Sequence, residues 1–247
     1  MADHVYSGGF YDYIDAGSRA SARTVARLLL GEMRIGSLLD VGAGHGAWAA
    51  EWMAAGVPDV LAVDGDYVAR DRLAIPSDRF QPHDLSQPLD LGRRFDLIQS
   101  LEVAEHLPAD KADAFVDSLT RHGDVILFSA AVPHQGGEHH VNEQPLGYWR
   151  AKFAVRGYQP YDWLRPRIAA DAEVMPWYRF NSLIYANEAG AERLSDDIRA
   201  TRVPESASVE VSGDLRWRTR RAVVRLIPAA LVKPIAMAKA AVEARLR

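Results

Sequence analysis

The chain has 247 residues, of which 48% are hydrophobic and 25% are charged, and it contains no cysteine. That length is enough for one large α/β domain with appendages, and the lack of cysteine excludes disulfides, thiolate metal sites and cysteine nucleophiles. The first residues lack the pattern of a secretory signal, and no run of about 18 apolar residues occurs. We therefore expect a cytoplasmic protein.

Charge is distributed unevenly along the chain. Residues 201–247 contain ten Lys or Arg and four Asp or Glu, a net charge of +6, so the overall charge of −4 leaves −10 on the first 200 residues. Proteins bind nucleic acid largely by neutralising its phosphates with basic groups. The acidic body therefore argues against a nucleic-acid partner.

The first half of the chain alternates apolar runs with helical patterns. The apolar runs predict buried parallel strands at 37–41, 60–64, 95–100 and 125–130. The helical patterns lie at 18–30, with Ser18 as candidate N-cap, and at 47–55, 67–73 and 109–121. This alternation is typical of a doubly wound α/β sheet with right-handed crossovers.

The second half begins with a polar loop at 133–145. A helical pattern at 146–155 follows, and then two strand patterns at 157–163 and 181–187, separated by a loop with Pro166, Pro176 and Trp177. Residues 196–213 predict a polar linker, and two helical segments follow at 215–226 and 229–246. We divide the chain into a domain at 1–195, in which 1–30 form an N-terminal cap or lid, and a tail at 196–247.

The tail alternates arginines with apolar residues, which predicts a basic amphipathic helix. Such a helix favours an anionic membrane surface, and it would place the protein peripherally at a membrane. The alternative is a helix packed on the domain or on a partner in a homodimer.

The stretch 38–46 reads Leu-Leu-Asp-Val-Gly-Ala-Gly-His-Gly, an apolar run that ends in a glycine-rich turn. Glycines in such a turn let the backbone approach a ligand closely. A dinucleotide site spaces its glycines as GxGxxG, whereas Gly42, Gly44 and Gly46 are spaced as GxGxG. With Asp40 before them, they resemble motif I of the class I S-adenosylmethionine (SAM) methyltransferases.

Two further acidic residues extend the resemblance, because Asp64 ends the second strand and Asp84 follows a short third strand. They match motifs II and III of that family. The resemblance implies that Asp64 binds the ribose hydroxyls, that Asp84 and the Leu85 N–H bind adenine, and that Asp40 faces the ammonium or orients the turn. The expected cofactor contacts also include Ala43, Gly65 and Ser100.

The family resemblance also completes the expected fold. It implies a seven-stranded, mostly parallel, doubly wound α/β sheet, in which the strands at 157–163 and 181–187 form an antiparallel final hairpin.

Glu102, Glu105 and His106 directly follow the predicted strand at 95–100. Two carboxylates and an imidazole at the carboxyl end of a strand are a composition that suits Mg²⁺, Mn²⁺ or a similar ion. In the other interpretation, the acid only supports the cofactor loop. The loop after the predicted strand at 125–130 adds His134, His139 and His140.

Glu-x-x-Glu-His followed by His-x-x-Glu is similar to the metal-dependent 2′-O-methyltransferases of small RNAs, and its first part is shared by the ubiquinone-pathway O-methyltransferases. The resemblance implies the metal ligands Glu102, Glu105, His106 and His140, with His139 as alternative. The cation would bind two neighbouring substrate hydroxyls and lower the pKa of one, and His106, His134 or His139 would act as general base. A metal-free enzyme with one histidine as base, or a purely structural histidine loop, are the alternatives.

As a whole, the chain resembles bacterial class I methyltransferases encoded with glycan-assembly enzymes, on residues 11–19, 136–149 and 177–181. Aromatic residues for stacking a sugar are at hand, unless they pack in the core: Tyr11, Tyr13, Trp149, Trp177 and Tyr178. We predict a SAM-dependent, metal-assisted O-methyltransferase of a sugar or glycoconjugate hydroxyl.

Three alternatives to that function stay open. The acceptor could be an RNA 3′ end or a small aromatic hydroxyl. The chain could also bind SAM without transferring its methyl group, although the intact set of Glu102, Glu105 and His106 argues against this.

Overall fold

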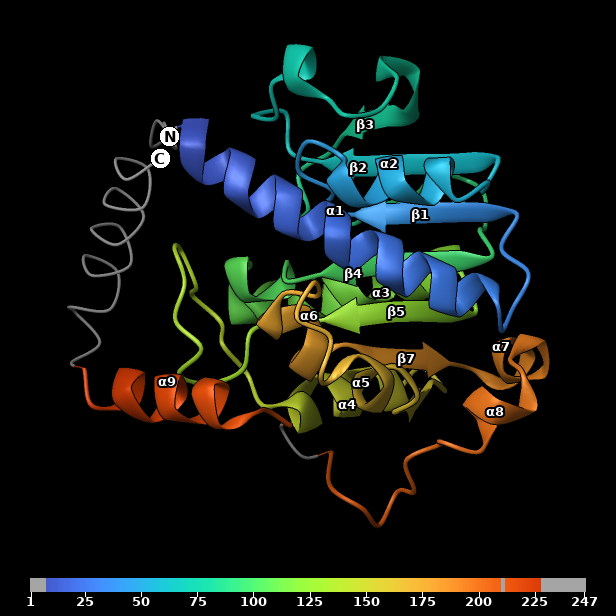
Figure 1. Cartoon of the computed structure of the whole chain (residues 1–247). Coiled ribbons are helices and arrows are strands. Elements are labelled where there is room, and N and C mark those ends of the chain that lie inside the picture. The colour runs from blue at the N-terminus through green and yellow to red at the C-terminus, as the bar shows by residue number, and fades with distance from the viewer. Residues whose placement is uncertain (1–7, 210–211, 228–247) are drawn as a thin grey trace.

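The computed structural model describes residues 8–209 and 212–227 (Figure 1). Seven strands form one sheet in the order β3-β2-β1-β4-β5-β7-β6. The strands are β1 Ser37–Val41, β2 Asp59–Asp64, β3 Phe80–Pro82, β4 Leu97–Leu101, β5 Val125–Ser129, β6 Gln159–Tyr161 and β7 Leu183–Ala186. Strands β1 to β5 pair in parallel, whereas β7 runs antiparallel to both β5 and β6. The predicted mostly parallel sheet with an antiparallel final hairpin is confirmed.

Helices cover both faces of the sheet. They are α1 Gly8–Leu30, α2 Ala47–Ala54, α3 Ala112–His122, α4 Leu146–Ala154, α5 Leu164–Ile168, α6 Pro176–Asn181, α7 Glu188–Arg193, α8 Asp196–Arg199 and α9 Leu215–Arg225. Side chains alternate across a strand, so Leu38 packs in one core with α1, α2 and α5, and Leu39 in a second core with α3 and α4. In Figure 1, α1 and α2 cross in front of the sheet and α3 lies behind it.

Two predicted helices differ from the structure. Helix α1 begins at Gly8, so Ser18 is an interior residue rather than an N-cap. Its hydroxyl lies 3.2 Å from the Tyr178 hydroxyl in the packed interior. The predicted helix at 67–73 is only a 3₁₀ turn, Arg70–Arg72. The chain bends back there, since the Ala74 N–H donates to the His45 carbonyl.

The loop predicted around Pro166 and Pro176 contains the short helices α5 and α6. Both prolines lie in the first turn of their helix, where the missing N–H needs no partner. Because α6 continues to Asn181, the last strand starts at Leu183 rather than at 181. Other predicted boundaries lie within one to three residues of those observed.

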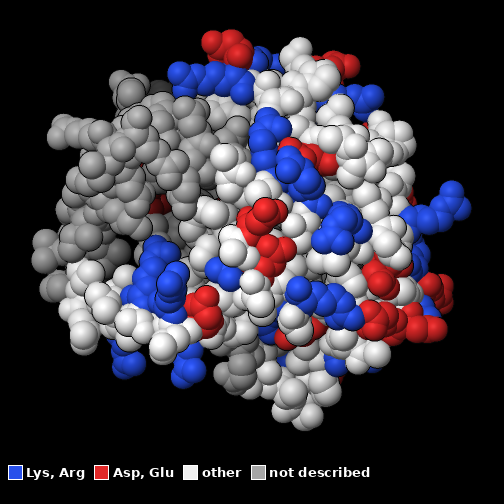
Figure 2. All heavy atoms as spheres, viewed as in Figure 1, with Lys and Arg blue, Asp and Glu red and all other residues white. Residues whose placement is uncertain are grey.

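The start of the tail is packed on the domain rather than free. Within the predicted linker, α8 buries Ile198, and Arg202 forms a bridge with Tyr161 of β6. Helix α9 confirms the first tail helix, whereas the predicted helix at 229–246 lies outside the described residues. Basic side chains gather along the edge where α9 lies (Figure 2). No helix in the described part of the chain is long and apolar enough to cross a bilayer.

Candidate functional site

The predicted site residues gather at the carboxyl ends of the parallel strands. This end faces left in Figure 1, where the N-terminal part of α1, the loop after β5 and α9 also lie. In open α/β sheets, ligands bind at this end of the strands. The crossover connections bring the turn after β1 and the segment after β4 together here, because β1 and β4 are neighbours in the sheet.

The three glycines of the turn after β1 all have positive φ, of 85°, 54° and 82° for Gly42, Gly44 and Gly46. At Gly42 a Cβ would lie 2.3 Å from Cγ2 of Val103, so the approach of the segment after β4 excludes any side chain. At Gly44 a Cβ would meet nothing within 4 Å among the described residues. The turn is thus closed on its inner side and open where a ligand would lie.

Asp64 at the end of β2 is buried, and its hydrogen bonds hold this turn in place. Its Oδ2 accepts a hydrogen bond from the Gly44 N–H at 2.7 Å, and its Oδ1 accepts from the Gly65 N–H and the Tyr67 hydroxyl, both at 2.6 Å. The sequence predicts Asp64 as a ribose acceptor, and the structure adds a second role, because the same carboxylate orients the glycine turn. Tyr67 was not identified by sequence reasoning.

Asp40 lies beneath the turn in a buried network. Its Oδ1 accepts a hydrogen bond from Gln99 Nε2 at 2.9 Å, and Gln99 Oε1 accepts one from Trp52 Nε1 at 2.8 Å. Burial, with a smaller contribution from the Asp64 carboxylate, raises the pKa of Asp40 to about 7 against the opposing hydrogen bond from Gln99. Gln99 and Trp52 belong to β4 and α2, and no sequence pattern marked them as partners of Asp40.

The remaining predicted cofactor residues lie around this turn. Asp84 is exposed two residues beyond β3, and its Oδ1 accepts a hydrogen bond from the Ser86 N–H at 2.9 Å. The hydrogen bonds from Ser86 lower the pKa of Asp84. Leu85 is half-buried beside it, and Ser100 is buried in β4. Their contacts with a cofactor remain predictions.

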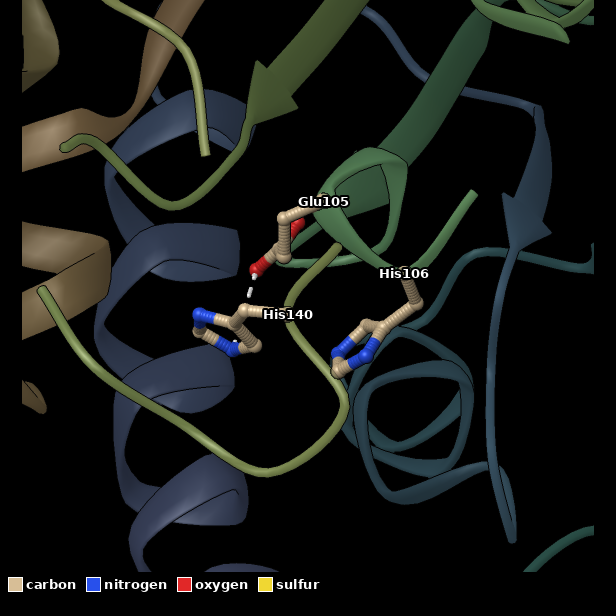
Figure 3. Close-up of side chains that lie close together, drawn as sticks. All are labelled: Glu105, His106 and His140. Atoms are coloured by element: carbon tan, nitrogen blue, oxygen red, sulfur yellow. Dashed lines mark ion pairs between the residues drawn. The ribbon is translucent and has the colours of Figure 1, made fainter. Parts of the chain in front are cut away.

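Glu105, His106 and His140 form a cluster beside the turn. One ligand atom from each lies within 4.8 Å of the others, and Glu105 Oε1 is 4.0 Å from His140 Nε2 (Figure 3). Glu105 is fully buried, and neither of its oxygens accepts a hydrogen bond of ordinary geometry within the described residues. Burial, with a further contribution from the Glu102 charge, raises the pKa of Glu105 well above its usual range.

Partial removal from water, followed by the proximity of His140, lowers the pKa of His106 to about 4, although the residue as a whole is exposed. At neutral pH the His106 imidazole is therefore uncharged. The His106 and His140 rings are 5.0 Å apart between centroids and nearly perpendicular. Two imidazoles and one carboxylate with free lone pairs form a donor set for a divalent cation.

Glu143 orients the histidine loop. Its Oε1 accepts hydrogen bonds from His140 Nδ1 at 2.9 Å and from the Gly136 N–H at 2.8 Å, and its Oε2 accepts from the His134 N–H at 2.9 Å. With Nδ1 as donor, the Nε2 lone pair of His140 remains for another partner. The His-x-x-Glu spacing at 140–143 was the signal for Glu143, although no role was predicted for it.

Glu102 lies beside the cluster rather than in it. Its Oε2 accepts a hydrogen bond from Gln135 Nε2 at 2.5 Å, and its Oε1 accepts from Asn181 Nδ2 at 3.2 Å. Three of the four predicted ligands thus come together, and the fourth is held by two amides that sequence reasoning missed. Burial is also the main cause that raises the pKa of Glu102.

Three non-glycine residues with positive φ surround this site, namely Glu102, His134 and His139 at 57°, 67° and 56°. Strained backbone of this kind concentrates at functional sites. Of the predicted bases, His106 lies in the cluster, His134 is exposed and His139 is half-buried in the same loop.

Comparisons with known proteins agree with the fold. The profile of the methyltransferase domain family matches residues 11–172. No curated protein matches the chain significantly. Similar solved structures include the sugar N-methyltransferase KedS8 from a Streptoalloteichus species, at 18% identity, TM-score 0.54 and coverage of 76% of this chain and 95% of that one.

Two more structures have similar scores. DesVI from Streptomyces venezuelae is 16% identical, with TM-score 0.56 and coverage of 76% and 99%. SAM-bound CalS10, an amino pentose methyltransferase from Micromonospora echinaspora, is 18% identical, with TM-score 0.53 and coverage of 76% and 100%. The family match and the seven-stranded sheet together show that this chain belongs to the methyltransferase domain family, with the fold of the class I SAM-dependent methyltransferases.

Proposed function

We propose that this protein is a SAM-dependent O-methyltransferase, assisted by a divalent cation, that acts on a hydroxyl of a sugar or glycoconjugate. The observation that carries the proposal is the buried Glu105 carboxylate. It has no hydrogen-bond partner of ordinary geometry within the described residues, and it lies beside two histidines where the strands end.

SAM would supply the methyl group, and the turn after β1 is suited to hold it. The open space above Gly44 accommodates a ligand against the backbone, and Asp64 lies within reach of the same space. Asp40 has one carboxylate oxygen without a full hydrogen bond in the described part of the chain. A buried acid of this kind is suited to receive the cofactor ammonium.

The residues present fit a divalent cation. Glu105, His106 and His140 would hold it, and Glu102 would join them if it exchanged its amide partners. Imidazole ligands favour Mn²⁺ over Mg²⁺ within the predicted pair of metals. A cation held there would supply Lewis acidity to neighbouring hydroxyls of the acceptor.

The roles of the histidines follow from this arrangement. His106 and His140 each have a ring nitrogen within 4.8 Å of a Glu105 carboxylate oxygen and would act as ligands, so His139 or His134 remains to accept the proton from the acceptor hydroxyl. Because the pKa of His106 is low, one nitrogen of its ring is unprotonated at neutral pH and its lone pair is available to a metal. Glu143 holds His140 in position through Nδ1, which would fix the place where a cation binds the acceptor.

A sugar acceptor is supported by the neighbours, since KedS8 is a sugar N-methyltransferase and CalS10 an amino pentose methyltransferase. Vicinal hydroxyls of a sugar can bind one cation together, which favours oxygen as the acceptor atom here. The predicted stacking residues Trp149 and Tyr178 are buried in the core and do not serve this role. Trp177 is half-buried, and the side chains of Tyr11 and Tyr13 lie outside the described ones.

Binding of Mn²⁺, followed by electron paramagnetic resonance of the free ion, tests the metal site without any turnover. We expect the wild type to bind Mn²⁺ and Glu105→Gln to lose affinity by about a hundredfold or more. The exposed Glu188→Gln is the matched control and should bind like the wild type. Equal binding by wild type, Glu105→Gln and His140→Ala would contradict the metal site.

Release of S-adenosylhomocysteine from SAM, measured with sugars, amino sugars, RNA 3′ ends and small phenols, tests the acceptor. We expect turnover with a sugar hydroxyl, loss of that turnover in EDTA and recovery with Mn²⁺. Turnover restricted to amino sugars and insensitive to EDTA would instead indicate N-methylation. SAM binding without turnover on any acceptor would indicate a SAM-binding protein.

A further inference from the structure

The inner side of α9 is fixed to the loop of the candidate site. Trp217 is 3% exposed, and its ring lies 5.7 Å from that of Phe180. Arg221 donates two hydrogen bonds, at 2.9 and 3.2 Å, to the Pro133 carbonyl, and Arg220 donates one to the Gly136 carbonyl. Helix α9 is therefore held at the same end of the sheet as the histidine cluster.

The outer side of α9 is apolar although it faces solvent. Leu215, Val223 and Leu226 are 79%, 54% and 83% exposed. Their spacing of i, i+8 and i+11 places them on one side of a helix with 3.6 residues per turn, opposite Trp217 and Arg221. Thr219 and Ala222 share this side and are also exposed. We call these five residues the outer strip.

Arginines border the outer strip on both sides. The helical spacing places Arg216 and Arg220 along one border and Arg218 and Arg225 along the other, and all four are exposed, although Arg220 also donates to the Gly136 carbonyl. No acidic residue occurs between 215 and 227. Figure 2 shows basic side chains above and below uncharged atoms along this edge. An apolar strip between two rows of arginine is the pattern of a helix that lies in a lipid interface.

We infer that the outer strip of α9 docks this protein onto an anionic lipid bilayer. The apolar side chains would enter the boundary between headgroups and acyl chains, and the bordering arginines would bind anionic headgroups. A protein partner would need acidic side chains placed opposite both rows of arginine. An anionic bilayer instead presents negatively charged headgroups along the whole length of the helix. The net charge of −10 on residues 1–200 is repelled by the same surface, which confines contact to the edge formed by α9.

This docking has a consequence that rests on the proposed function. Because Arg221 and Arg220 bind the loop that carries His134 and His140, the bilayer would lie beside the open end of the site. An acceptor sugar attached to a lipid would then reach the site from the membrane surface.

Co-sedimentation of the full chain with vesicles, without SAM or acceptor, tests the docking independently of catalysis. We expect binding to vesicles of phosphatidylcholine with phosphatidylglycerol, much weaker binding to phosphatidylcholine alone, and release at high salt. Val223→Asp/Leu226→Asp should lower binding about tenfold or more. Val155→Asp, at an exposed valine following α4, is the matched control and should bind like the wild type.

Charge reversal separates the electrostatic contribution to vesicle binding from the apolar contribution. Arg216→Glu/Arg218→Glu should lower binding to anionic vesicles about tenfold or more, while Arg27→Glu on the exposed side of α1 should not. Equal binding by wild type and both α9 variants would overturn the inference. So would a dimer in analytical ultracentrifugation that Val223→Asp/Leu226→Asp dissociates, because the strip would then be a contact between two copies of the chain.

Discussion

At the scale of single residues, Asp64 connects the cofactor turn to the sheet. Its carboxylate accepts hydrogen bonds from Gly44, Gly65 and Tyr67, so one side chain both shapes the turn and lies where the ribose is expected. Asp64→Ala should weaken SAM binding on the order of 10- to 100-fold in calorimetric titration, as expected for lost charge-assisted hydrogen bonds. The exposed Asp66→Ala should bind like the wild type, and unchanged affinity in Asp64→Ala would contradict the assignment.

Asp40 gives the stability of the free protein a distinct pH dependence. Its folded-state pKa is raised from 3.8 to about 7, so its stabilising contribution is fully present below about pH 4 and is lost as the pH rises through about 7. Between these values, the unfolding free energy of wild type minus that of Asp40→Asn should fall by roughly 4 kcal/mol. Urea unfolding at several pH values measures this, and a constant difference would exclude the predicted shift.

At the scale of elements, the close approach of the turn after β1 to the segment after β4 makes Gly42 irreplaceable. Gly42→Ala adds a clash with Val103 to the cost of a positive φ, and it should lower the unfolding free energy by about 2–4 kcal/mol. Gly56→Ala is the matched control, since Gly56 has φ of 97° and nothing within 4 Å of its Cβ position in the described structure. It should cost about 1 kcal/mol. Equal urea midpoints would show that the approach is looser than described.

Two of the predicted helices show that packing against other elements decides whether a helical sequence pattern forms a full helix. The pattern at 18–30 is part of a longer helix, because α1 lies across α2 and extends past the end of the sheet (Figure 1). The pattern at 67–73 also predicted a helix, but it buries only Val68 and forms a single 3₁₀ turn. Local sequence alone does not separate these outcomes, since packing against other elements supplies most of a helix's stability.

At the scale of the whole molecule, charge is split between an acidic body and a basic tail. Because a net charge of −10 on residues 1–200 repels phosphates, we expect no binding of a short single-stranded RNA at physiological ionic strength, as measured by fluorescence anisotropy. The same RNA with a free 3′ end should not be methylated. Binding with a steep salt dependence would favour the RNA alternative and contradict the prediction.

The sequence by itself determined the fold class and the place of the site. Apolar runs of strand length, glycines at alternate positions and acids at strand ends are local features. Parallel topology then brings the carboxyl ends of the strands to one edge. Asp40, Asp64, Glu105, His106 and His140 were identified from these features together with the family resemblance, and the structure places them at that edge.

Only the tertiary structure decided which of these side chains face one another. Glu102 turns to Gln135 and Asn181, while Glu105 is left buried beside His140, and Glu143 selects the nitrogen that His140 presents. The tertiary structure also decided that α9 packs on the loop of the candidate site with its apolar outer strip facing solvent. The physical reason is that burial and hydrogen-bond partners depend on residues far apart in the chain, and these meet only when the sheet and its loops are assembled.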